Sequence, residues 1–255
     1  MISRRRKQIR ALIEREGEVQ LRNLKDSFPQ VSMMTLRRDL DSLEKEGHVI
    51  RTHGGAVSVR RLMNSGEEHP YETRAGENRK GKQAIAKRAL PYVEKNRSLF
   101  FDAGSTVMCL AEILPNEEFS VLTSGLNIAI EILKRSKPLV MTVGGSVNRN
   151  TFSVSGPSAM DLIDTFNIDL ALMGTSGFSV ESGFTVANVY EGNLKRKVVE
   201  QARKVIVLMD SSKINKNMAF TYAGLKDIDV IVSEKPLPED VENEVKKFNI
   251  EICCS

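Results

Sequence analysis

The chain has 255 residues, of which 41% are hydrophobic and 27% charged, and its formal net charge is +4. This is enough chain for one small and one larger domain. No run of about 18 or more apolar residues occurs, and the basic N-terminus is not followed by an apolar stretch. We therefore expect no membrane span and no secretory signal, and a cytoplasmic location.

Cysteine and histidine are too few and too scattered for a metal site. Cys253 and Cys254 are adjacent, which cannot form a disulfide framework, and Cys109 has no ligand-like spacing to any histidine. We expect reduced thiols, no metal and no cofactor.

Two short helices are expected before residue 29. Apolar residues at helical spacing predict one helix over Ser3–Glu16, which Gly17 ends, and another over Leu21–Phe28. Pro29 then interrupts the helical pattern.

The segment Val31–Gly47 has the features of a complete helix. Ser32 suits the N-cap, and Gly47 suits the left-handed position after the last turn. One face would carry Leu36, Leu40 and Leu43, and the opposite face Met34, Arg37, Arg38 and Asp41. The alternative is an ordinary surface helix on which Arg37 pairs with Asp41.

A hairpin is expected after this helix. His48–Arg60 reads as two short strands around His53-Gly54-Gly55, whose glycines would supply the positive φ values of a tight turn. Three helices and a hairpin indicate a winged helix-turn-helix, with Met33–Glu46 entering the major groove of DNA. Residues 1–61 hold 14 Lys and Arg against 8 Asp and Glu, a net charge of +6, whereas the remainder carries −2. That excess favours binding to a phosphate backbone.

The same segment carries a family resemblance. Its motif is Val31-Ser32-x-x-Thr35-Leu36-Arg37-Arg38-Asp39-Leu40-x-x-Leu43-Glu44-x-x-Gly47, followed by Arg51-Thr52-His53-Gly54-Gly55-Ala56. This resembles the signature of the DeoR family of bacterial transcriptional regulators. The resemblance implies that DNA is faced by Ser32, Thr35, Arg37, Arg38, Arg51 and His53, and we add Met34 from the same exposed face. Arg38 is the best candidate for reading a base, because Ser42 at i+4 cannot neutralise it.

The rest of the chain predicts a second domain. Residues 61–81 are polar and are interpreted as a linker between a head at 1–60 and a domain at 82–255. After a helix over Lys82–Tyr92, apolar strands alternate with helices, which predicts an α/β fold with a parallel sheet covered on both faces. The expected strands are Ser98–Phe101, Ser120–Thr123, Leu139–Val143, Ile168–Met173, Val205–Asp210, Asp229–Ser233 and Ile250–Cys253.

Nearly every expected strand ends in Gly, Ser or Thr, and ligands of such sheets bind at the carboxyl ends of the strands. Asp102-Ala-Gly104-Ser105-Thr106 would place free N–H groups and two hydroxyls at a helix N-terminus, as in a phosphate site. Neither a Walker loop nor GxGxxG is present, which argues against nucleotide chemistry. The alternative is that these turns favour Gly and Ser only for their own conformation.

The resemblance extends to these loops. The Asp-x-Gly-Ser-Thr, Gly-Gly and Asp-x-Ser-Lys motifs, together with Tyr71-Glu72-x-Arg74 and Asn78-x-x-x-Lys82, match the DeoR effector domain. That domain resembles ribose-5-phosphate isomerase and coenzyme A transferases in fold and typically binds phosphorylated sugars. The resemblance implies these ligand-binding residues: Asp102, Gly104, Ser105, Thr106, Thr123, Ser124, Gly144, Gly145, Lys195, Asp210 and Lys213.

Two functions are weighed. The first is a repressor of a carbohydrate-utilisation operon that binds double-stranded operator DNA and is controlled by a phosphorylated sugar. It would be a homodimer or homotetramer, since repeated half-sites need paired heads. The second is a sugar-phosphate isomerase with Asp102, Glu191 or Asp210 as the base. A DNA-reading head has no purpose in an isomerase, so we expect a regulator without catalytic residues.

Overall fold

The computed structural model describes residues 2–16, 18–51, 54–58 and 69–254. The chain divides into two compact units, Met1–Ser65 and Gly66–Ser255. None of the described helices is long and apolar enough to cross a membrane.

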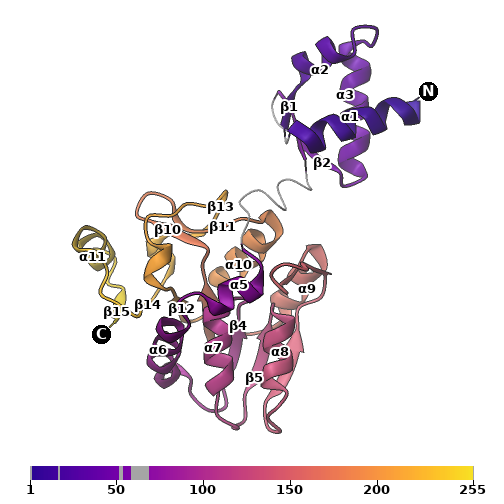
Figure 1. Cartoon of the computed structure of the whole chain (residues 1–255). Helices are drawn as coiled ribbons and strands as arrows, with labels where there is room; N and C mark the ends of the chain where they lie inside the picture. Colours follow the sequence, from indigo (N-terminus) through magenta and orange to yellow (C-terminus); the bar gives the residue numbers. More distant parts are fainter. Residues whose placement is uncertain (1, 17, 52–53, 59–68, 255) are drawn as a thin grey trace. The chain divides into compact units, whose positions relative to one another are not determined.

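The first unit is a small helical domain with a three-stranded sheet (Figure 1). Its core is formed by apolar residues that recur at helical spacing, among them Ile9, Ile13, Leu24, Leu36 and Leu40, each 0% exposed. The strands are antiparallel in the order β1-β3-β2, which gives the expected winged helix-turn-helix. Its elements are α1 (Ile2–Glu16), β1 (Glu18–Gln20), α2 (Leu21–Ser27), α3 (Met33–Lys45), β2 (Val49–Arg51) and β3 (Gly55–Ser58).

The glycines of the wing differ from the expectation. Neither Gly54 nor Gly55 has a positive φ. Instead β1, which the sequence did not predict, pairs with β3, and a Cβ on Gly55 would lie 1.8 Å from the carbonyl oxygen of Val19. Gly55 is therefore required by the close approach of two backbones.

The second unit begins with helices α5 (Tyr71–Gly76) and α6 (Arg79–Ala89), so α5 lies within the segment interpreted as a linker and α6 starts earlier than Lys82. The linker itself stays a prediction. The following elements are η1 (Leu90–Tyr92), β4 (Ser98–Phe101), α7 (Ser105–Ile113), β5 (Ser120–Thr123), α8 (Leu126–Ile132), β6 (Leu139–Thr142), β7 (Ser146–Val147), β8 (Val154–Ser155), α9 (Pro157–Thr165), β9 (Leu170–Gly174), β10 (Gly177–Ser179), β11 (Gly183–Val186), α10 (Val189–Gln201), β12 (Val205–Leu208), η2 (Ser211–Lys213), β13 (Phe220–Ala223), η3 (Leu225–Asp227), β14 (Val230–Val232), α11 (Glu239–Lys246) and β15 (Glu251–Cys253).

A seven-stranded sheet forms the centre of this unit, in the order β15-β14-β12-β9-β4-β5-β6. Each pair is parallel, as predicted from the apolar strand runs. The chain builds outward from β4 to β6, then returns to the other side of β4 and builds outward again from β9. The strand order therefore reverses between β4 and β9, and a crevice opens there at the carboxyl ends of the strands.

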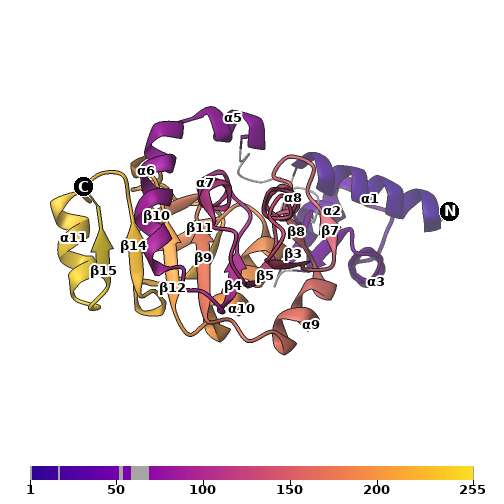
Figure 2. The same ribbon diagram turned by 90° about the horizontal axis from the view of Figure 1, so that it is seen from below.

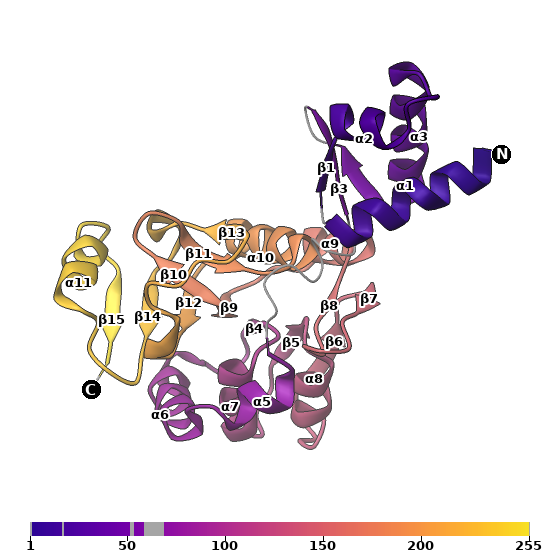
Figure 3. The ribbon, with the colours of Figure 1, turned by 45° about the horizontal axis from the view of Figure 1, so that its top comes forward.

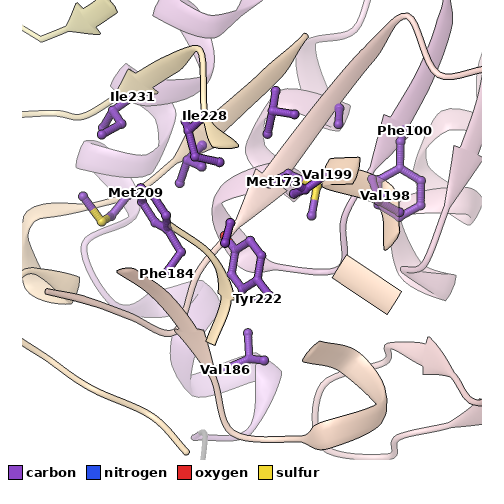
Figure 4. Close-up of a cluster of buried hydrophobic side chains, with 14 of the residues drawn as sticks. Phe100, Met173, Phe184, Val186, Val198, Val199, Met209, Tyr222, Ile228 and Ile231 are labelled. Atoms are coloured by element: carbon purple, nitrogen blue, oxygen red, sulfur yellow. The ribbon is translucent and has the colours of Figure 1, made fainter. Parts of the chain in front are cut away.

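Both faces of this sheet are covered (Figures 2 and 3). Helices α6, α7 and α8 pack on one face, where Leu99 and Phe101 of β4 point. Helices α9 and α10 cover the other face together with the antiparallel sheet β10-β11-β13. Figure 4 shows that face, with Phe184 and Tyr222 (ring centroids 6.2 Å apart) near Met173. The α/β fold class is confirmed, whereas the small sheet and the β7–β8 hairpin were not predicted.

Candidate functional site

The helix expected to enter DNA begins and ends as predicted. The Thr35 N–H donates to Ser32 Oγ at 3.2 Å, which makes Ser32 the N-cap of α3. Gly47 has a φ of 73°, and the His48 N–H donates to the Leu43 carbonyl at 2.9 Å.

The two faces of α3 also separate as predicted. Leu36, Leu40 and Leu43 are buried, whereas Met34 is 58% exposed. Arg37 and Arg38 are exposed, and in the described part of the chain neither guanidinium has an ion pair or hydrogen bond. The exposed face thus presents two arginines that are available to phosphates or bases.

The alternative interpretation, in which Arg37 pairs with Asp41, is wrong. Asp41 instead forms an ion pair with Arg51 of the wing, whose own N–H donates to Glu44 Oε1 at 2.7 Å. Arg51 therefore fastens β2 to α3, and its contact with DNA stays a prediction. His53 lies outside the described residues.

The second candidate site lies in the crevice between β4 and β9. Gly104, Ser105 and Thr106 form the start of α7, and among the described residues no acceptor faces their N–H groups. On the other side, Gly174 ends β9, and Thr175 and Ser176 follow it. Converging N–H groups and hydroxyls at a helix N-terminus can hold an oxyanion.

A buried network of ion pairs and hydrogen bonds, made by Asp102, Lys195 and Glu191, holds these loops in place. Asp102, 1% exposed, accepts from the Gly174 N–H at 2.9 Å and from Lys195 Nζ. Lys195 Nζ also donates to the Gly174 carbonyl at 2.9 Å and lies 3.4 Å from Glu191 Oε1. Burial lowers the pKa of Lys195, but Asp102 and Glu191 outweigh it and raise the pKa overall, so the ammonium stays charged.

Several predicted ligand residues serve this framework. Asp102 was expected to bind the ligand, yet both of its oxygens have partners within the protein. Thr123 Oγ1 donates to the Phe101 carbonyl at 2.7 Å, and Ser124 Oγ accepts from the Ala103 N–H at 2.9 Å. These side chains hold the loop in place, and direct ligand contact from them stays a prediction.

Gly144 and Gly145 are not brought to the crevice. They follow the edge strand β6, separated from β4 by β5. Gly145 has a φ of 133°, and a Cβ there would lie 2.5 Å from the Ser155 carbonyl oxygen, so the β7–β8 hairpin accounts for it.

Two neighbouring hollows open at the crevice. The smaller, about 20 Å³, is lined by the start of α7, the loop after β9, Glu191 and Lys195. The larger, about 360 Å³, matches the size of a small polar metabolite. Its lining residues are His69, Arg74, Glu77, Asn78, Lys82, Ser176, Asp210, Ser212, Lys213, Lys216 and Met218.

The larger hollow is rich in basic groups. Lys213 lines both hollows and has no ion pair within the described chain. Lys82 is 3% exposed, and burial lowers its pKa. Asp210, 2% exposed, accepts from the Ser212 N–H at 3.0 Å and so caps the short helix η2 that carries Lys213. The predicted pair of Asp210 and Lys213 is thus brought to the hollow.

Sequence reasoning missed the residues of the hollow that precede the first strand. Arg74, Asn78 and Lys82 lie in the segment interpreted as a linker or just after it. The signal was present, because the resemblance motifs include Arg74, Asn78 and Lys82, but no position in the fold was assigned to them.

Comparisons with known proteins assign both parts of the chain to one family. The DeoR-like helix-turn-helix domain matches residues 5–61, and the DeoR C terminal sensor domain matches residues 77–235. The chain is 34% identical to the transcriptional regulator GlpR of Haloferax volcanii over 87% of this chain and 86% of that protein. It is 28% identical to a putative aga operon transcriptional repressor of Escherichia coli O157:H7, over 98% of this chain and 93% of that protein. It is 26% identical to the glycerol-3-phosphate regulon repressor of Escherichia coli K12, over 94% of each chain.

A solved ribose 5-phosphate isomerase A from Methanocaldococcus jannaschii matches with a TM-score of 0.41 and 16% identity, over 54% of this chain and 55% of that one. A match this weak assigns no activity. The relatives quoted above are named as transcriptional regulators, which supports a regulator and not the isomerase alternative. With one model covering its helix-turn-helix and another most of its α/β unit, this chain belongs to the DeoR family of DNA-binding transcriptional regulators.

Proposed function

We propose that this chain represses a carbohydrate-utilisation operon and that a phosphorylated sugar or related metabolite in the crevice controls its affinity for operator DNA. In the first unit, Arg37, Arg38 and the capped start of α3 would contact the DNA. Hydroxyls and N–H groups position a protein on phosphates, whereas an arginine can specify guanine.

One observation carries the effector half of this proposal. At the crevice between β4 and β9, N–H groups of Gly104, Ser105 and Thr106 that have no acceptor among the described residues line the smaller hollow. Lys213 lines this hollow and also the neighbouring 360 Å³ hollow, which contains Lys82. The N–H groups and the lysines suit a phosphate, and Asn78, Asp210 and Ser212 can bond to hydroxyl groups. Because Asn78, Asp210 and Ser212 all form hydrogen bonds, the hollow suits a small phosphate with several hydroxyl groups better than an apolar ligand.

Titration calorimetry on the full chain tests the effector half. We expect at least one compound among glycerol 3-phosphate and hexose 6-phosphates to bind, and its unphosphorylated counterpart not to bind. Lys213→Ala should weaken that binding by about 1.5–3 kcal/mol, as expected for a hydrogen bond between charged groups. Lys226→Ala removes an exposed lysine elsewhere in the unit and serves as the control. Equal binding with and without the phosphate would refute the proposed ligand class.

The oligomeric state is part of the proposal. Two heads are needed to read two half-sites, so we propose a homodimer or homotetramer. Light scattering on the purified chain measures this directly, and a monomer at the concentration that saturates operator DNA would contradict it.

A further inference from the structure

The seven-stranded sheet ends at β6 in an open edge. Among the described strands, β6 pairs only with β5, so its outer side has no strand partner there. The N–H groups of Leu139 and Val143 donate to carbonyls in or beside β5. Because partners alternate along a ladder, the N–H groups of Val140 and Thr142 point to the free edge. Such an edge can pair with a strand of another chain.

The free edge at β6 carries no charged side chain, whereas the opposite edge of the sheet does. Charged residues commonly protect edge strands from pairing. The sequence of β6 is Leu-Val-Met-Thr. At the opposite edge, β15 carries Glu251, which is exposed and accepts from the Tyr92 hydroxyl at 2.6 Å. Of the two edges, β6 is therefore the one suited to association.

Exposed apolar side chains lie beside this edge on both faces of the sheet. On one face, Ile130 and Leu133 of α8 are 65% and 61% exposed. Val140 packs in the core cluster on that face and Met141 in the cluster on the other face. Alternation along β6 then places Leu139, 61% exposed, on the face opposite α8. We call Ile130, Leu133 and Leu139–Thr142 the edge patch. Apolar groups gathered at a surface in this way mark an interaction site.

The exposed side of α8 faces away from α7. The Arg135 guanidinium donates to the carbonyls of Glu112, at 2.6 Å, and Leu114, so this side of α8 faces the end of α7. At about 100° per residue, Leu133 lies about 200° round the helix from Arg135, and Ile130 only about 60° from Leu133. Helix α8 is the last helix on its face before the edge at β6 (Figure 3). Ile130 and Leu133 therefore project beyond the covered part of the sheet.

The charges around the edge patch favour a copy of the same surface as its partner. Glu131 pairs with Lys134, and Glu117 pairs with Lys137 at 3.5 Å. Both signs of charge thus lie at the rim, each with an opposite charge beside it. Such a surface has no field of one sign to attract nucleic acid or an anionic membrane, and it is complementary to itself. Lipid also could not pair the backbone groups that point outward from β6.

The spacing of strands and helices allows two copies to fit together. A strand that pairs with its own counterpart around a twofold axis must run antiparallel to it. Helix α8 contacts both β5 and β6, so its axis lies above this pair of strands. With strands about 4.8 Å apart, two joined β6 edges would place the two α8 helices about 10 Å apart, which is the distance between packed helices. Ile130 and Leu133 would then be buried between the two helices.

We propose that the edge patch is the surface through which two copies of this chain associate, with β6 antiparallel to β6 of the second copy. The two sheets then form one continuous sheet, and α8 packs on its counterpart. This inference rests on the oligomeric state proposed above and deepens it by naming the contact surface.

Sedimentation velocity on the full chain tests the location of this surface. The double variant Ile130→Glu/Leu133→Glu should raise the dissociation constant of the contact about a hundredfold or more, because it buries charges at the centre of the interface. The particle mass should then fall by half at a concentration where the unaltered chain is associated. Phe248→Glu is the control, because Phe248 is 48% exposed and lies between α11 and the opposite edge strand.

Both substituted side chains of the double variant are exposed in the single chain, so the variant should fold, and melting followed by circular dichroism checks this. A folded double variant with unchanged mass would overturn the edge patch and leave the proposed oligomer intact. A monomeric unaltered chain would contradict the oligomer as well.

Hydrogen exchange resolved at single residues tests the strand pairing. The amides of Val140 and Thr142 should exchange slowly in the associated unaltered chain and quickly in the double variant, because only pairing across the edge gives them acceptors. An associated unaltered chain in which these two amides exchange quickly would overturn the pairing of β6 with its counterpart.

Discussion

Arg38 is the residue on which we expect sequence reading to depend. Its exposed guanidinium has no partner in the described part of the chain. Arg38→Ala should weaken operator binding by about 1–3 kcal/mol and relax preference at one base position, because an arginine can grip guanine O6 and N7 together. Fluorescence anisotropy on operator and random duplexes measures this, with Arg203→Ala as control. An equal loss on both duplexes would mean that Arg38 contacts only phosphate.

Asp39 shows where residue roles could not be read from sequence. It belongs to the family motif, but the helical spacing of apolar residues assigned it no role. In the structure it is 4% exposed and accepts from Arg5 Nε at 2.6 Å and from Arg5 Nη2 at 3.2 Å. Arg5 is 34 residues away, whereas spacing rules detect partners only three or four positions apart on one helix. The same limit applies to the alternative pairing of Arg37 with Asp41, because Asp41 pairs with Arg51, ten positions away.

Glu234 links the end of α5 to the loop that carries Lys213. Burial raises its pKa, but hydrogen bonds from Ser211 and Asn78 outweigh burial, and the pKa falls below the ordinary value of 4.5. A lowered pKa contributes stability above about pH 4.5 that is lost as pH falls through the folded-state value.

The melting temperature of Glu234→Gln should therefore lie below that of the unaltered chain at pH 7, and the difference should shrink as pH falls below 4.5. Glu181→Gln, on an exposed turn, is the control. Differential scanning calorimetry across this range measures both. A difference that does not change with pH would show that the charge of Glu234 contributes nothing.

At the scale of elements, long and strongly patterned segments were predicted well. Helix α3 was predicted with both of its ends, because cap residues and a leucine stripe coincide in one short segment. The strands of the parallel sheet were predicted from their continuous apolar runs. β1, β10 and β11 were missed, since they lie outside the apolar runs of the parallel sheet and depend on antiparallel partners elsewhere in the chain.

Pairing between β1 and β3 yields a test at this scale. Gly55→Ala would place a Cβ 1.8 Å from the Val19 carbonyl oxygen, so the two strands must separate. We expect the first unit to lose about 1–3 kcal/mol of stability, the usual cost of overpacking. Gly76→Ala is the matched control, because a Cβ there meets nothing within 4 Å. Calorimetry of the full chain in which Gly55→Ala unfolds no earlier than the unaltered protein would contradict the pairing.

The effector site was predicted only in part. Loops at the strand ends were expected to gather, and Gly104, Ser105, Thr106 and Lys213 do lie together. Which loops meet depends on strand order, and the reversal between β4 and β9 cannot be read from the pattern of strands along the chain. For that reason Gly144 and Gly145 were included although they lie at the edge, and Arg74 was left out.

The whole molecule combines two units that each bury a core of their own. An effector can change DNA binding only if it has different affinities for two states of the molecule. By linkage, operator DNA must then change effector affinity by the same factor. The coupling free energy can therefore be measured in two independent ways: as the effect of the effector on operator affinity, and as the effect of operator DNA on effector affinity.

The most direct test is an anisotropy titration of the full chain on its operator at increasing concentrations of a phosphorylated sugar that binds by calorimetry. Typical coupling energies predict a change in operator Kd of about 5-fold to 150-fold. It should reach its plateau at the sugar concentration that saturates the crevice, and Lys213→Ala should shift that plateau to higher concentration. An operator Kd that stays constant while the crevice is saturated would contradict the account.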